Sequence, residues 1–284
     1  MKYPQLTVFN YKIAYYAMRL VGLYWLISQY LRFSQLQGRP KEVYVPFFWL
    51  EKIIFPEFPG ILLFTGLCIG CAVCIIISVL KPSYFLNTLI FLLMAVINLP
   101  LSANFGLHND NHLVILGFFL SIFLLPKNLE EKDYKWVQYF YLGILMTYTF
   151  AGASKFLGTI KNLMNNTDKM LWIDKNAAKM NSFGSYWAAD VSIPVWMKEV
   201  YAYENLWVFL TMTGISLQLL CFLGAFNRKL LTFFMLFIVV FHLYNIVFVL
   251  ADFRNAIFFV LAALFPYHLL IPLFKRNRNQ KMNH

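Results

Sequence analysis

Long apolar stretches constrain the fold of this chain more than any other feature of its sequence. Seven or eight segments approach the roughly 20 apolar residues that cross a bilayer as a helix. The composition agrees, since 60% of the 284 residues are hydrophobic and only 13% are charged. Soluble domains carry about 25% charged residues. The sequence therefore predicts an all-α, polytopic membrane helix bundle with about eight transmembrane helices.

We expect one transmembrane domain over residues 1–284, without an internal repeat. The predicted spans are, approximately, residues 13–31, 61–80, 84–105, 112–126, 137–157, 206–226, 230–250 and 255–274. The first is too long for a cleavable signal peptide and carries Arg19 inside it. Residues 38–59 are broken by prolines and rich in aromatic residues, so we expect this segment to lie along the membrane interface. The polar connection 158–204 is expected to be a folded or interfacial loop.

The distribution of basic residues predicts the orientation of these spans. With eight spans both termini share one side of the membrane, and that side carries twelve basic residues, namely Lys2, Lys12, Lys81, Lys127, Lys132, Lys135, Arg228, Lys229, Lys275, Arg276, Arg278 and Lys281. The short loops opposite carry five, namely Arg32, Arg39, Lys41, Lys52 and Arg254. Lysine and arginine are retained on the cytoplasmic side, which predicts cytoplasmic termini. The net charge of +11 has the same explanation, so no nucleic-acid partner is expected.

The end of the fifth predicted span, residues 147–157, concentrates the features of a reactive site. Ala151 and Gly152 are small enough to let another helix approach closely. Lys155 follows one turn later, with no carboxylate nearby in the sequence. A lysine that loses its hydration can exist as a free amine, which acts as a base or nucleophile. The alternative is that Lys155 is an anchor that extends to the interface.

The predicted orientation brings polar residues from several segments to the outer leaflet, where Lys155 lies. Ionisable groups in membrane segments usually face an interior cavity and indicate function. These residues are His108, Asn111, His112, His242 and Asn245, with Asp252 and Arg254 just outside. For His242 and Asn245 a structural role, hydrogen bonding between helices, is the alternative. Arg19 and Gln218 are single polar residues within spans that either line a cavity or pair across helices.

The sequence does not favour a metal site. His108, His112 and His242 have no acidic residue at ligand spacing, so we interpret them as hydrogen-bonding or proton-relay residues. Cys68, Cys71 and Cys74 lie in an apolar span and are interpreted as small hydrophobic residues, with no disulfide framework implied. The chain also has no phosphate-binding glycine loop, no nucleophile elbow and no paired-carboxylate site.

Three motifs, in order along the chain, resemble one family. Asn111-His112 before an apolar helix, the segment Ala-Gly-Ala-Ser-Lys-Phe at 151–156, and the segment Phe-His-Leu-Tyr-Asn at 241–245 are similar to motifs of vitamin K-dependent γ-glutamyl carboxylase and its relatives. These proteins form the horizontally transferred transmembrane (HTTM) domain family. The resemblance covers roughly residues 10–275.

The resemblance implies a reaction type and roles for individual residues. Lys155 would be the base that deprotonates a reduced, vitamin K-like quinone, whose oxygenation drives carboxylation of glutamate in the carboxylase. His112 would assist this chemistry, and His242, Asn245 and Asn111 would bind the quinone. A peptide or small molecule would be the second substrate.

The chain also departs from the carboxylase. It ends at His284, about ten residues after the last predicted span, without the large soluble region that binds peptide substrates, and it has Asp252 and Arg254 where the family has small or polar residues. Capture of a propeptide-bearing substrate is therefore not expected. The alternative function is a non-catalytic membrane helper for the maturation or export of a secreted peptide. Both functions would operate in a cell membrane, and the composition suggests a bacterial one.

Overall fold

The computed structural model describes residues 2–46, 49–102, 111–165 and 169–271. These residues contain eleven α-helices and four short 3₁₀ helices, with no strand among them, so the predicted all-α class is confirmed. The chain divides into two compact units, each described by itself below. Unit 1 comprises Met1–Phe140 and Phe258–His284, and unit 2 comprises Tyr141–Ile257.

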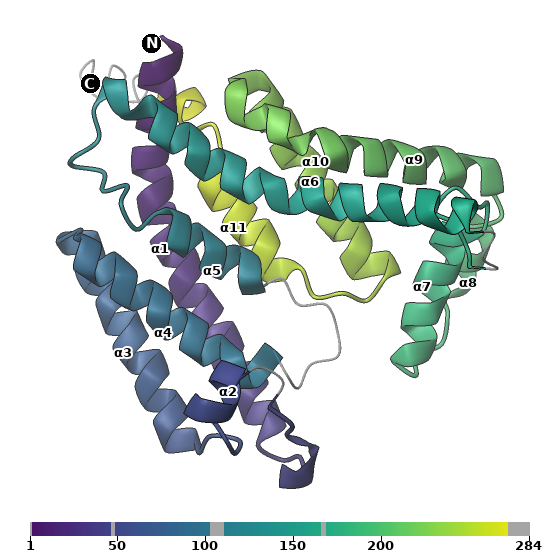
Figure 1. The fold of residues 1–284 in the computed structure, drawn as a ribbon, viewed down its shortest axis with the longest axis horizontal. Helices are drawn as coiled ribbons and strands as arrows, with labels where there is room; N and C mark the ends of the chain where they lie inside the picture. Colours follow the sequence, from purple (N-terminus) through teal and green to yellow (C-terminus); the bar gives the residue numbers. More distant parts are fainter. Residues whose placement is uncertain (1, 47–48, 103–110, 166–168, 272–284) are drawn as a thin grey trace, which may run out of the picture. The chain divides into compact units, whose positions relative to one another are not determined.

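Unit 1 is organised around its first helix, α1 (Tyr3–Leu36), which packs against α3 (Ile61–Leu80) and α4 (Tyr84–Ser102) (Figure 1). The short helices α2 (Trp49–Ile54) and α5 (Asn111–Leu120) and the start of α6 (Tyr134–Met164) complete this part of the chain, together with most of α11 (Arg254–Leu264). Aromatic side chains fill the contacts of α1. Phe33 stacks on Phe64 of α3 with ring centroids 3.7 Å apart, and Trp25 is fully buried.

Close helix packing in unit 1 depends on two glycines. A Cβ atom at Gly22 of α1 would lie 2.7 Å from the ring of Phe118, and one at Gly117 of α5 would overlap the ring of Phe259. Since neither position has room for a side chain, the aromatic rings of α5 and α11 pack directly on backbone. These contacts hold the short helices α5 and α11 within the unit.

Unit 2 contains most of α6, then α7 (Ala177–Ala188), α8 (Val195–Val200), α9 (Glu204–Leu220) and α10 (Arg228–Phe248). A 3₁₀ helix, Cys221–Phe226, joins α9 to α10 (Figure 1). The connection predicted to be a folded loop thus contains two helices. Their core is aromatic and includes Phe183, Tyr201 and Trp207, with Tyr244 and Phe248 of α10 packed against it.

Among the described residues, four helices are long and apolar enough to cross a membrane, namely α3, α4, α9 with its 3₁₀ extension, and α10. They correspond to four of the eight predicted spans. Two other predicted spans lie in α1 and α6, which are longer, at 34 and 31 residues, and less uniformly apolar. The predicted end of the third span, residue 105, lies outside the described residues.

The remaining two predicted spans contain shorter helices than expected. The helix α5 has 10 residues and α11 has 11, so each rises only about 15 Å of the roughly 30 Å hydrocarbon core. After α5, Ser121 bonds back to the carbonyl of Phe118 through its hydroxyl, and the chain turns. After α11, Pro266 cannot donate a helical hydrogen bond, and a 3₁₀ turn, Tyr267–Leu270, follows. Residues 272–274 of the last predicted span lie outside the described residues.

Candidate functional site: the Lys155 cavity

The Lys155 site begins with a close approach of two helix backbones in unit 2. A Cβ atom at Gly152 of α6 would lie 2.7 Å from the backbone nitrogen of Leu219 and 2.8 Å from Cβ of Gln218, both in α9. The prediction that this glycine lets another helix approach is therefore confirmed. Lys155 lies one turn further along α6, at the level of the residues that α9 presents there.

Lys155 finds its hydrogen-bond partner on α9. Its Nζ donates to Oε1 of Gln218 at 3.0 Å, and Gln218 is almost fully buried, with 1% of its surface exposed. Gln218 therefore pairs across helices, and it also lines the cavity described below, so both roles left open for it are observed. No ion pair between Lys155 and a carboxylate occurs in the part of the chain that the structure describes. The amine is held by a neutral acceptor.

Two aromatic rings lie near the same amine. Nζ of Lys155 is 5.5 Å from the ring centroid of Trp172 and 5.2 Å from that of Phe241. Both distances fall within the range of cation–π attraction. The ring faces and the Gln218 oxygen thus provide the electrostatic stabilisation that a carboxylate would otherwise supply to an ammonium.

Lys155 faces a cavity of about 300 Å³ that lies wholly within unit 2. The walls come mainly from α9 and α10, with α7 and Trp172 contributing the remainder. Most of the lining is apolar or aromatic, and Trp207 and Phe237 are examples. The polar groups are few, as is typical of sites for small organic molecules. They are Lys155, Asn181, Thr211, Gln218, Tyr244 and Asn245.

The two residues of α10 that were expected to bind the quinone differ in their position relative to the cavity. Asn245 lines the cavity, and its Nδ2 donates to the carbonyl of Phe241 at 2.8 Å. His242 is not among the lining residues. Its Nε2 shares a 2.8 Å hydrogen bond with the hydroxyl of Tyr148, and its ring stacks on Phe253 with centroids 4.6 Å apart. His242 therefore has the helix-to-helix hydrogen bond that was the alternative interpretation.

Asn111 and His112 belong to unit 1, whereas Lys155 belongs to unit 2. Asn111 is buried, its Nδ2 donates to Oε1 of Gln29 at 2.7 Å, and its Oδ1 accepts from Nε1 of Trp25 at 3.1 Å. His112 is exposed within its unit. That these residues share a pocket with Lys155 stays a prediction, and His108 lies outside the described residues.

Sequence reasoning missed several cavity residues. Trp172, Asn181 and Tyr244 come from three different segments; Tyr244 lies beside Asn245 in the motif at 241–245, whereas no motif includes Trp172 or Asn181. The aromatic spacing of the connection 158–204 was the only available signal. Of the three cysteines interpreted as small hydrophobic residues, Cys68 and Cys71 are buried and Cys74 is half-buried, and Cys221 is also buried. Within the described ranges, no three histidine, cysteine or acidic residues come together as metal ligands would.

Comparison with known proteins adds no relative. No protein-family model matches the chain, and no curated protein or solved structure matches it. The class that the structure supports is accordingly a coarse one. In the part of the chain that the structure describes, the protein is all-helical, with four helices able to span a membrane by length and composition and a lysine-bearing cavity between helices.

Proposed function

We propose that this chain is an integral membrane protein of the HTTM type, in which the Lys155 cavity binds a lipid-soluble ring compound and Lys155 acts as a base towards it. The observation that carries the proposal is a lysine held by a neutral amide in an aromatic-lined cavity. An anchoring lysine needs no such cavity, because its amine reaches the interface and stays hydrated.

The cavity lining fits a reduced quinone in its chemistry. Apolar and aromatic walls suit a ring and its alkyl substituents, and Lys155, Asn181 and Asn245 offer polar contacts for hydroxyl or carbonyl groups. A reduced quinone would supply an acidic ring hydroxyl. This compound class follows from the resemblance of the three motifs.

The contacts of Lys155 suit a proton acceptor. In its neutral form the amine can take a proton at Nζ and become an ammonium. That ammonium would be stabilised by Oε1 of Gln218 at 3.0 Å and by the ring faces of Trp172 and Phe241. General bases act from positions within hydrogen-bond reach of the proton that they remove. Asn245 and Tyr244, which line the cavity beside Phe241, would orient the ring.

A cavity-filling substitution tests binding. Gly214 lines the cavity, and a Cβ atom there would meet nothing within 4 Å, so Gly214→Leu should place its side chain in the cavity. We expect the purified protein in lipid nanodiscs to lose at least about tenfold in affinity for a reduced short-chain naphthoquinone. The matched control is Gly158→Leu in α6, since Gly158 also has nothing within 4 Å and does not line the cavity. Unchanged affinity in Gly214→Leu would contradict the proposal.

A second pair of variants tests whether Lys155 is a base. Arginine stays protonated and therefore cannot accept a proton, but it keeps the positive charge of lysine. Lys155→Arg should therefore abolish oxygen-dependent consumption of the reduced quinone and leave the yield of inserted protein unchanged. An anchor would tolerate arginine and suffer from Lys155→Ala instead. Full activity of the arginine variant would remove the catalytic role. Binding without turnover in every variant would favour the non-catalytic helper.

A further inference from the structure

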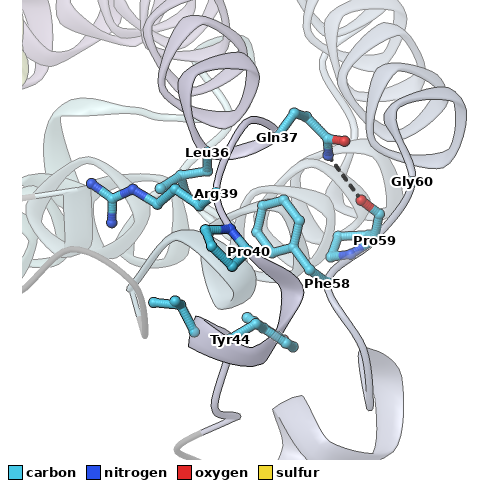
Figure 2. A pocket seen from close by; sticks show the side chains of 9 residues that line it. Leu36, Gln37, Arg39, Pro40, Tyr44, Phe58, Pro59 and Gly60 are labelled. Atoms are coloured by element: carbon cyan, nitrogen blue, oxygen red, sulfur yellow. Dashed lines mark hydrogen bonds between the residues drawn. The ribbon is translucent and has the colours of Figure 1, made fainter.

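A second pocket lies in unit 1, in the segment that joins α1 to α3. Its volume is about 280 Å³, and it is enclosed by the end of α1, the 3₁₀ helix Lys41–Val43 and the residues just before α3. Nε2 of Gln37 donates to the carbonyl of Pro59 at 3.2 Å and so joins the two ends of the segment. Figure 2 shows this hydrogen bond on one side of the pocket and the Arg39 side chain on the other, with Pro40 and Phe58 between them.

The rest of the segment is held together by a buried acid. Glu51 of α2 is fully buried, and its Oε1 lies 3.0 Å from the hydroxyl of Tyr44, which lines the pocket. The same hydroxyl is 3.0 Å from the carbonyl of Phe55. Burial and the neighbouring Glu51 raise the pKa of the Tyr44 phenol, so the phenol remains a hydrogen-bond donor. The segment is therefore a folded lobe rather than an irregular loop.

The outer face of the short helix α2 carries large exposed apolar side chains. Trp49 is 73% exposed and Ile53 69% exposed, and they lie one turn apart on α2. Leu50 and Ile54 extend the same face, while Glu51 points inward. A short helix with an apolar outer face suits insertion into the boundary between lipid headgroups and acyl chains.

The neighbouring span places the pocket at that boundary. Gly60 lines the pocket, and α3, the most apolar candidate span, begins at the next residue. Leu62 in its first turn is 87% exposed, which is the exposure of a side chain that faces lipid. Tryptophan and tyrosine favour this level of a membrane, and a guanidinium binds phosphate oxygens through two parallel hydrogen bonds. Trp49, Tyr44 and Arg39 supply these groups.

We propose that the pocket beside Arg39 binds the phosphate headgroup of a bilayer phospholipid. The guanidinium of Arg39, which extends outward from the pocket (Figure 2), would hold the phosphate, and the apolar walls formed by Pro40 and Phe58 would cover the glycerol and the upper acyl chain. The exposed face of α2 would lie in the same bilayer leaflet. This site lies wholly in unit 1 and does not depend on the function of the Lys155 cavity.

The first test blocks the pocket. A Cβ atom at Gly60 would meet nothing within 4 Å, so the side chain in Gly60→Leu has room to occupy the mouth of the pocket. The full-length protein in mild detergent would be titrated with dioctanoyl phosphatidylglycerol and its bound lipids counted by native mass spectrometry. We expect one saturable site in the wild type and at least about tenfold weaker binding in Gly60→Leu. Gly38→Leu is the control, because Gly38 is equally unobstructed and lies outside the pocket.

The second test separates the pocket from general charge and from free anions. Arg39→Gln should weaken binding about tenfold, as loss of a charge-assisted hydrogen bond does, whereas Arg32→Gln makes the same charge change outside the pocket and should leave binding unchanged. Inorganic phosphate at the lipid's concentration should not compete. Equal effects of the two arginine variants, equal competition by phosphate, or wild-type binding in Gly60→Leu would each overturn the proposal.

Discussion

At the scale of single residues, unit 1 contains a buried cation that, like Lys155 in unit 2, is held by an amide oxygen and an aromatic ring. Arg19 of α1 is fully buried, and no carboxylate pairs with it among the described residues. Its Nη2 donates to Oδ1 of Asn87 at 2.8 Å, and its guanidinium lies 3.4 Å from the ring centroid of Tyr15. The hydroxyl of Tyr15 donates to the same Asn87 oxygen. An amide and an aromatic face thus replace a counter-ion at a charge that is costly to bury.

These contacts predict opposite results for two substitutions. Arg19→Met removes the buried charge and leaves Asn87 bonded to Tyr15, so it should be nearly neutral for the free energy of unfolding or stabilising. Asn87→Leu removes the acceptor of a buried guanidinium and should destabilise by about 2–3 kcal/mol. Thermal unfolding in detergent compares the two variants. Greater loss in Arg19→Met would show that the charge itself stabilises the unit.

Tyr201 supports a pH prediction. This residue follows α8, is 2% exposed, and shares hydrogen bonds with Ser182 at 2.5 Å and with Tyr244 at 3.1 Å. Burial, above all other causes, raises the pKa of its phenol above the ordinary value of 10.0. Its contribution to stability is therefore fully present below about pH 10 and is lost as the pH rises through the folded-state pKa.

Absorbance titration of tyrosinate near 295 nm checks this directly. Between about pH 9 and 11 the folded wild-type protein and Tyr201→Phe should give the same amplitude, because Tyr201 stays protonated there. A smaller amplitude in the variant, by the share of one tyrosine among 17, would contradict the prediction. Measurement must precede alkaline unfolding, which circular dichroism monitors.

At the scale of helices, the position of Lys155 depends on how closely α6 approaches α9. Gly152 and Gly158 lie in the same helix, six positions apart, and differ only in surroundings. A Cβ atom at Gly152 would lie 2.7 Å from backbone, whereas one at Gly158 would meet nothing within 4 Å. The alanine substitution is chemically identical at both positions, so the comparison isolates packing from helix propensity.

Gly152→Ala should therefore destabilise the protein by about 1–3 kcal/mol through overpacking. Gly158→Ala should stabilise it by up to about 1 kcal/mol, since alanine is the better helix former. Thermal unfolding of the two variants under the same detergent conditions makes the comparison. Equal shifts for both would show that α6 and α9 do not pack at Gly152 as described.

At the scale of the whole molecule, the four candidate spans among the described residues leave much of their apolar surface uncovered by protein. In the apolar 18-residue window of each candidate span only 22–33% of the residues are buried within the protein, so most residues of these windows are partly or fully exposed. Such surface on a soluble monomer would drive association. The eight spans expected from the sequence are an even number, which predicts that the two termini lie on one side of the membrane.

Both termini should be cytoplasmic, because the side that carries them has twelve basic residues against five in the opposite short loops. Alkaline phosphatase fused after His284 should therefore be inactive, and a cytoplasmic reporter at the same position active. Fusions in the connection 158–204 should show the reverse pattern. An active phosphatase at His284 would show that the predicted orientation is wrong and that both proposed sites lie on the other side of the membrane.

The all-helical class and the four candidate spans among the described residues followed from the sequence alone, because an apolar run of about 20 residues satisfies its backbone hydrogen bonds in lipid only as a helix. The close approach at Gly152 was also readable, since a small residue before an isolated lysine is a local signal. The ends of the helices were harder to predict from the sequence. Ser121 and Pro266 interrupt segments that hydropathy alone reads as continuous.

Only the tertiary structure decided which polar residues meet. Lys155 and Gln218 are 63 positions apart, and Asn111 and Gln29 are 82 apart. The two interpretations of Gln218 were equally compatible with its sequence, because helical periodicity gives the face of a residue on its own helix and not the rotation of that helix against a neighbour. The same packing directs His242 to Tyr148 and leaves Asn245, three residues later, at the cavity wall.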